Sequence, residues 1–297
     1  MRLSHLVDDV PRILKVWPDR PALFRRPPEA FDDLLSIEEL NHLIDAECLA
    51  ARNIVMVKDG NVLERHTFID GDMPRPGAIR AHLNSGGTIS VRQLQTLKPS
   101  LRRLRDAIQQ ETGCGVHVNA YLTPAGAQGL KYHYDPYVTL IVQLSGRKTW
   151  PLHPPFVRNP TTEYGNFLGR GFTREELYYL ANTPPRESFT LSPGDVFWLP
   201  RGYVHSPYTE GEETSLHLTF ALKERTLHWL ADQVVSDILA QALADPALRA
   251  EIPPASLLTC PTEVIAWTRQ YLLGRLLLLQ PEHVAELART AATDVNR

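Results

Sequence analysis

The chain has 297 residues, of which 43% are hydrophobic and 22% charged, as in an ordinary globular protein with a full core. Its formal net charge is −3 and it has no long basic run, so the composition argues against direct nucleic-acid binding. The three cysteines, Cys48, Cys114 and Cys260, lie far apart without a CxxC pair, so neither a disulfide framework nor a thiolate zinc site is indicated, and the cytoplasm is expected.

Residues 1–89 are expected to be a support region of short helices and strands. The first 35 residues are rich in proline and predict irregular structure, without the apolar stretch of a signal peptide. Ser36 is expected to begin a helix over residues 37–51, because Glu39 completes a capping box with it.

A hairpin, a loop and a helix are expected next. The β-like runs 53–58 and 62–68 flank Asp59-Gly60, a dipeptide typical of hairpin turns. Residues 70–87, rich in glycine and proline, predict a loop. A helix is expected over much of 90–111, with a new start or a kink at Pro99.

From residue 115 to residue 222 the pattern becomes that of a β domain. A tight turn is expected at Ser145-Gly146, and the insertion 153–187 should hold a helix that begins after Thr173, which forms a capping box with Glu176. Short strands with glycine and proline between them are typical of a barrel or sandwich. The predicted strands are 116–122, 138–144, 148–152, 188–191, 195–199 and 215–222.

Residues 224–297 return to helical periodicity, over 226–244 and 262–293. The longest apolar run, 272–279, is interrupted by charge and is much shorter than the ~20 residues that cross a bilayer, so no membrane span is expected. Part of the apolar surface should cover the β domain, and the rest should pair with a second copy in a homodimer. The apolar stripes are formed by Leu227, Leu230, Val234, Ile238, Leu272, Leu276 and Leu279.

Three residues of the β region have the spacing of a metal site. His133 and Asp135 would point to the same face of a strand, and His205 follows the turn after the strand 195–199. Two histidines and one carboxylate leave coordination positions open and are diagnostic of non-haem Fe(II) oxygenases. A His-x-Asp pair alone often arises by chance, so the prediction depends on the conjunction with His205 and its surrounding turns and strand.

These segments resemble the JmjC-type oxygenases of the cupin superfamily, and most of all the ribosomal oxygenases. The resemblance is strong from about residue 90 to residue 222. It is carried by Asn119–Gly129, His133-Tyr134-Asp135, Gln143–Trp150 and Pro193–His205. It implies an α+β fold: a double-stranded β-helix (jelly-roll) core over 90–223, flanked by the N-terminal helices and the C-terminal helical region.

The resemblance also implies a set of site residues. His133, Asp135 and His205 match the Fe(II) ligands. Lys148 matches the base that pairs with the distal carboxylate of 2-oxoglutarate. Two further positions, Tyr121 and Asn119, match groups beside the same co-substrate, as does Thr219 on the last strand.

The expected activity is hydroxylation of a protein or peptide side chain, with 2-oxoglutarate and O2 as co-substrates. The substrate would be a ribosomal protein or a biosynthetic peptide. An N-methyl-lysine demethylase is an alternative within the same chemistry. A non-catalytic metal-binding scaffold would not need Lys148 with Tyr121, and a zinc or manganese cupin would more often show a further ligand soon after Asp135.

Overall fold

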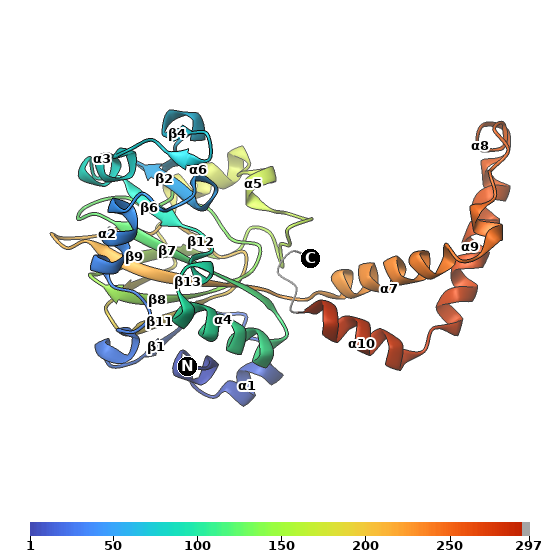
Figure 1. Cartoon of the computed structure of the whole chain (residues 1–297), viewed down its shortest axis with the longest axis horizontal. Helices are drawn as coiled ribbons and strands as arrows, with labels where there is room; N and C mark the ends of the chain where they lie inside the picture. Colours follow the sequence, from blue (N-terminus) through green and yellow to red (C-terminus); the bar gives the residue numbers. More distant parts are fainter. Residues whose placement is uncertain (293–297) are drawn as a thin grey trace. The chain divides into compact units, whose positions relative to one another are not determined.

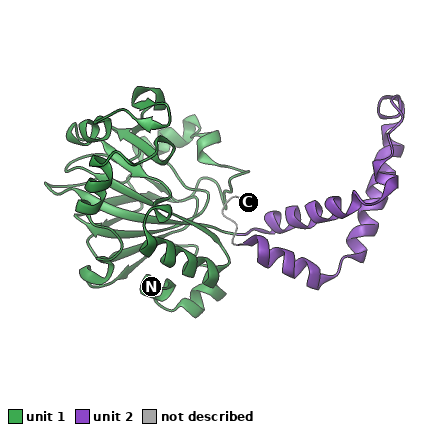
Figure 2. Ribbon diagram, in the orientation of Figure 1, with its two compact units in different colours: residues 1–224 green, residues 225–297 purple. Residues whose placement is uncertain are grey.

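The structure is a computed structural model that describes residues 1–292, so the last part of the expected C-terminal region, from Thr293 on, lies outside it. Contacts divide the chain into a first unit, residues 1–224, and a second unit that begins at Arg225 (Figure 2). No helix in the described part combines the length and apolar character that a bilayer crossing requires.

The first unit is built on an antiparallel sheet of eight strands and a second sheet of three (Figure 1). In order across the large sheet, the strands are β1 (Ala22–Arg25), β11 (Asp195–Leu199), β8 (Val138–Ser145), β13 (Ser215–Lys223), β7 (Gly115–Thr123), β6 (Thr88–Val91), β2 (Ile54–Lys58) and β3 (Asn61–Val62). The small sheet contains β10 (Glu187–Leu191), β9 (Lys148–His153) and β12 (Val204–His205).

The large sheet has one apolar face and one face with polar side chains, because successive residues of a strand point to opposite sides. On β7, Val118 and Ala120 belong to the main core, whereas Asn119, Tyr121 and Thr123 belong to the opposite face. The apolar face packs against helices that include α2 (Ile37–Asp45), α3 (Ala78–Asn84) and α4 (Pro99–Thr112).

The polar face of the large sheet is covered in part by the small sheet. A second apolar cluster joins the two: Ile141 and Phe197 of the large sheet pack with Trp150 and Leu191 of the small one. The turn that leads from β8 to β9 contains Gly146 at φ +61°, where an added Cβ would lie 2.3 Å from the carbonyl oxygen of Thr214. The predicted Ser145-Gly146 turn is therefore confirmed, and only glycine suits it.

The strands predicted between residues 115 and 222 agree with the structure within one or two residues, and both capping boxes are present. The N-terminal region differs more. The expected irregular start contains the helix α1 (Val10–Lys15) and the edge strand β1, and the helix from Ser36 ends at Asp45.

The hairpin at Asp59-Gly60 is present, but its second strand is only Asn61–Val62. The expected loop 70–87 contains α3, whose N-cap is Gly77 with no side-chain cap, so no capping signal marks it. The expected helix over 90–111 was wrong before Pro99, since residues 88–91 are a fully buried strand. Pro99 does begin a helix, as residue N1 of α4.

The second unit is helical. It contains α7 (Leu227–Ala242), the short α8 (Ser256–Thr259), α9 (Pro261–Leu278) and α10 (Pro281–Ala292). Ile238 is buried within it, but Leu227 is 86% exposed and α9 contains no buried residue. Large apolar side chains on α9 are exposed: Ile265, Trp267, Leu273, Leu276, Leu277 and Leu278.

Candidate metal centre

Backbone pairing brings the two predicted histidine ligands together. The amide of His133 donates to the carbonyl of His205 at 3.0 Å, and the amide of His205 donates back at 2.8 Å. The expectation that His133 and Asp135 lie on a regular strand was wrong: His133 forms only an isolated bridge, with β12. The carbonyl of Asp135 accepts from the amide of Gly202, which fixes the carboxylate beside the turn before His205.

The side chains of His133, Asp135 and His205 converge. Their potential ligand atoms all lie within 4.8 Å of one another, and His205 Nε2 is 3.8 Å from Asp135 Oδ2. Each histidine places Nδ1 at hydrogen-bond distance from the carbonyl two residues earlier, 2.7 Å for His133 and 2.9 Å for His205. A carbonyl only accepts, so Nδ1 carries the proton and Nε2 is left as a ligand, as in known metal sites.

The electrostatics of the cluster favour a bound cation. Burial raises the pKa of Asp135, although His133 and Arg92 oppose that shift. Burial also lowers the pKa of His205 well below its usual value, and the neighbouring His133 lowers it further. The His205 imidazole is therefore held neutral beside the Asp135 carboxylate, and two imidazoles with one carboxylate are a donor set that suits a divalent transition metal.

Lys148 lies on the first position of β9 and is only 1% exposed. Its Nζ donates to the hydroxyl of Thr123 at 2.6 Å, and no carboxylate among the described residues lies within ion-pair distance. Desolvation lowers the pKa of Lys148 to about 7. A buried ammonium without a counter-charge is costly, so this position is suited to an anionic ligand.

The other predicted residues lie on the same polar face as Lys148's partner Thr123. Tyr121 stacks on His217 of β13, with ring centroids 4.9 Å apart and planes within 6°. Thr219 is opposite Asn119 in the register of β13 and β7, and both side chains are largely buried. The side-chain oxygen of Asn119 accepts a hydrogen bond from the backbone amide of Gln93, so this oxygen already has a partner.

Two residues of this interior were missed in the sequence. Thr123 continues the alternation from Asn119 and Tyr121, so its place on their face could have been predicted from the strand period, although its contact with Lys148 could not. Trp150 is 4% exposed, and its ring centroid lies 5.6 Å from that of His205. Its indole N–H is buried and has no hydrogen-bond partner in the described part of the chain. Nothing local in the sequence distinguishes it from a core tryptophan.

Comparison with known proteins finds one matching family model and several similar proteins. The model of the JmjC domain family matches residues 90–230, which include the whole cluster. Ribosomal oxygenase 2 of Bos taurus is 31% identical over 271 residues, covering 84% of this chain and 53% of that protein. The Dictyostelium discoideum protein named bifunctional lysine-specific demethylase and histidyl-hydroxylase NO66 is 34% identical over 144 residues, covering 48% of this chain and 27% of its own length.

The chain thus spans about half the length, or less, of the curated relatives it matches. Among solved structures, Escherichia coli YcfD has a TM-score of 0.57 at 17% identity, covering 95% of this chain and 71% of that one. Another structure of YcfD, described as a ribosomal oxygenase in complex with cobalt and 2-oxoglutarate, has a TM-score of 0.54 at 17% identity, covering 95% of this chain and 70% of that one. At this identity the likeness establishes a shared fold.

Proposed function

We propose that the chain is an Fe(II)- and 2-oxoglutarate-dependent oxygenase that hydroxylates a protein or peptide side chain, because residues 90–230 match the JmjC domain family and the chain is similar to ribosomal oxygenase 2. The observation that carries the proposal is Lys148, a buried lysine in the same interior as the three-ligand cluster, with no counter-charge among residues 1–292. A metal-binding scaffold would have no use for that lysine.

His133, Asp135 and His205 would hold the iron, because two imidazoles and one carboxylate suit Fe(II) and leave positions for other ligands. The iron and 2-oxoglutarate, when bound, would supply the oxidising chemistry. The protein's part is binding and orientation. Lys148, with the hydroxyls of Tyr121 and Thr123, would bind the distal carboxylate, and Asn119 and Thr219 would line the same face.

The direct test is formation of succinate. We expect anaerobically purified protein to convert 2-oxoglutarate to succinate only when Fe(II) and O2 are both supplied, and to turn over faster with a ribosomal-protein peptide present. Mass spectrometry of the peptide would then show the added oxygen atom. Succinate that forms equally without Fe(II) would contradict the proposal.

A demethylase is the second candidate, because the Dictyostelium relative carries that activity in its name. Hydroxylation of an N-methyl carbon releases formaldehyde, whereas hydroxylation of an ordinary side-chain carbon leaves the oxygen on the peptide. The same assay separates the two activities when methylated and unmethylated peptides are compared and formaldehyde is measured.

Binding of 2-oxoglutarate should depend on pH through Lys148. Its pKa in the free protein is lowered to about 7 by burial, and a bound carboxylate would raise it again. Above about pH 7 binding must therefore take up a proton, so the affinity should fall by at most about tenfold for each further pH unit. Titrations at several pH values measure this. Lys148→Met should remove the slope, and an unchanged slope in that variant would assign the proton to another group.

The arrangement of the two sheets and the division of the chain into regions are also part of the proposal. We infer that the two sheets together form the double-stranded β-helix, with residues 1–89 as its support, 90–223 as its core and 224–297 as a separate helical region. The apolar cluster that joins the sheets supports this view, as does the break in contacts between residues 224 and 225.

The insertion 153–187 would form part of the substrate surface. Its outer side chains Tyr164, Leu168 and Tyr178 are between 72% and 89% exposed, while Phe167 and Phe172 pack inward beside Tyr134. Exposed aromatic side chains on an insertion that contacts the metal-binding segment suit a polypeptide better than a small metabolite.

We further propose that the protein is a cytoplasmic homodimer that pairs through the second unit. The supporting observation is α9, an 18-residue helix with no buried residue and exposed leucines at its C-terminal end. Light scattering at micromolar concentration should give the mass of two chains, and Leu277→Lys should shift it toward one. A monomeric mass for the unmodified protein would contradict the proposal.

A further inference from the structure

The insertion between β9 and β10 is fastened to the metal-binding segment at Tyr134, the residue between the ligands His133 and Asp135. Tyr134 is 2% exposed, and its hydroxyl donates to the carbonyl of Gly165 in the insertion at 2.7 Å. Its ring packs edge to face against Phe167, with centroids 5.4 Å apart. Phe167 in turn lies 6.2 Å, between ring centroids, from the imidazole of His133.

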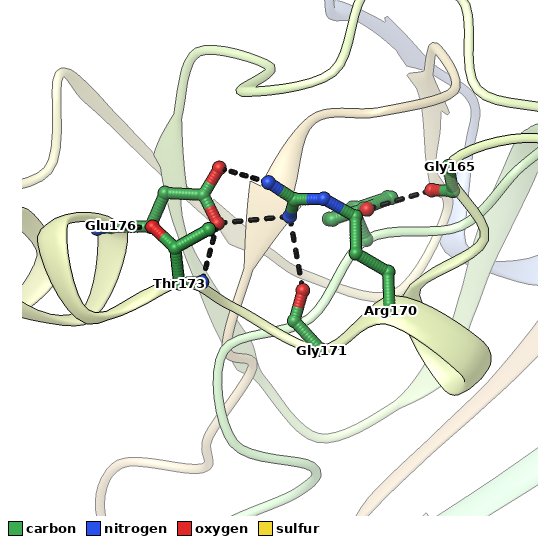
Figure 3. Close-up of polar contacts among 6 residues, drawn as sticks. Gly165, Arg170, Gly171, Thr173 and Glu176 are labelled. Carbon is green, nitrogen blue, oxygen red and sulfur yellow. Dashed lines mark hydrogen bonds and ion pairs between the residues drawn. The ribbon is translucent and has the colours of Figure 1, made fainter.

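Arg170 closes the insertion on itself next to that contact. Its guanidinium donates to both carboxylate oxygens of Glu176, at 2.8 and 2.6 Å, and to the carbonyl of Gly171 at 3.0 Å (Figure 3). The same carboxylate accepts from the amide of Thr173 at 2.9 Å, in the capping box of α6 (Arg174–Asn182). One ion pair therefore ties the end of α5 (Phe167–Arg170) to the first turn of α6.

This ion pair is stronger than an ordinary surface contact. The Glu176 side chain is 14% exposed and the Arg170 side chain 30%. Two parallel charge-assisted hydrogen bonds fix the guanidinium in one orientation. The hydrogen bonds between Arg170 and Glu176 lower the pKa of the Glu176 carboxyl group and raise the pKa of the Arg170 guanidinium. Both groups therefore stay charged near neutral pH.

We infer that Arg170 and Glu176 are positioning residues of the metal centre. They hold α5 in place, α5 holds the Phe167 ring against His133 and Tyr134, and that packing limits the rotation of the His133 ring. The inference depends on the proposed metal binding at His133. Linkage makes the effect reciprocal: if the ion pair favours the metal-binding arrangement, metal binding must favour the closed insertion to the same extent.

The experiment measures binding of Co(II) to metal-free protein by its visible absorption, with no turnover involved. Arg170→Met should weaken Co(II) binding by about tenfold or more, the usual effect of residues that support metal ligands. Arg174→Met is the matched control, because Arg174 is an exposed arginine on the same insertion, and it should bind Co(II) like the unmodified protein. Chymotrypsin should cut the insertion faster in Arg170→Met, and Co(II) should protect it less.

Two further variants keep the inference falsifiable if Arg170→Met does not fold. Glu176→Gln and Tyr134→Phe each remove part of the same connection, and each should also weaken Co(II) binding. Unmodified affinity in folded variants, with normal binding by the unmodified protein, would overturn the positioning role alone. Failure of the unmodified protein to bind Co(II) would instead overturn the proposed function.

Discussion

His205→Ala should reduce 2-oxoglutarate turnover to the level measured without added iron. The variant leaves two ligands, His133 and Asp135, and an incomplete donor set binds Fe(II) too weakly to retain it. His133→Ala and Asp135→Ala should have the same result. Succinate formation with saturating Fe(II) and 2-oxoglutarate is the measurement.

The fold should survive these substitutions, which separates loss of the metal from loss of the protein. The core of the first unit consists of apolar side chains from the large sheet and the helices, and none of the three ligands belongs to it. Thermal unfolding of metal-free protein should therefore change little in His205→Ala. His66→Ala is a control, because His66 is an exposed histidine outside the cluster. Iron-dependent turnover that persists without His205 would show that the metal lies elsewhere.

Lys148→Met should have the second large effect, on the co-substrate. Losing one partner of a buried charge pair costs ~2–5 kcal/mol, so the KM for 2-oxoglutarate should rise about tenfold or more. Arg147→Ala is the matched control, since Arg147 is the exposed neighbour of Lys148. A normal KM in Lys148→Met would move the carboxylate contact to another residue, with Arg147 the first to be examined.

The same variant should be more stable than the unmodified protein when no ligand is bound. The pKa of Lys148 is about 7 in the folded chain and near its ordinary value of 10.5 in the unfolded chain. Between these values unfolding takes up a proton, so this group makes the folded protein less stable as the pH falls from 10.5 toward 7. Methionine has no ionisable group, so the variant does not lose stability in this way. A rise in the melting temperature together with a rise in KM would identify Lys148 as a functional rather than a structural residue.

The β region could be predicted because its strands carry their signals locally. Strands such as β7 and β13 are long, and glycine or proline marks turns between strands, as at Gly146 between β8 and β9. The N-terminal region lacks such signals. α3 begins at Gly77 without a capping side chain, and β6 has only four residues, so its alternation of polar and apolar side chains is too short to identify a strand.

The convergence of His133, Asp135 and His205 was predictable from the sequence, but the contacts that hold them together were not. A two-residue spacing suggested that His133 and Asp135 share a strand face, yet they converge because His133 pairs with His205 across a single bridge. Arg170 and Glu176 are six residues apart in a loop, and only the folded insertion shows that they join two helices beside Tyr134. Contacts of this kind depend on tertiary packing, which no local pattern encodes.

An anaerobic titration tests most directly whether iron and 2-oxoglutarate bind together at this site. Fe(II) and a chelating keto acid give a visible charge-transfer absorption only when both are bound to one another, so the band reports the complex before any turnover. We predict that the unmodified protein develops this band with one equivalent of Fe(II), that Lys148→Met needs about tenfold more 2-oxoglutarate to reach it, and that His205→Ala does not develop it. Absence of the band in the unmodified protein, or an undiminished band in His205→Ala, would contradict the assignment of His133, Asp135 and His205 as an Fe(II) site for 2-oxoglutarate chemistry.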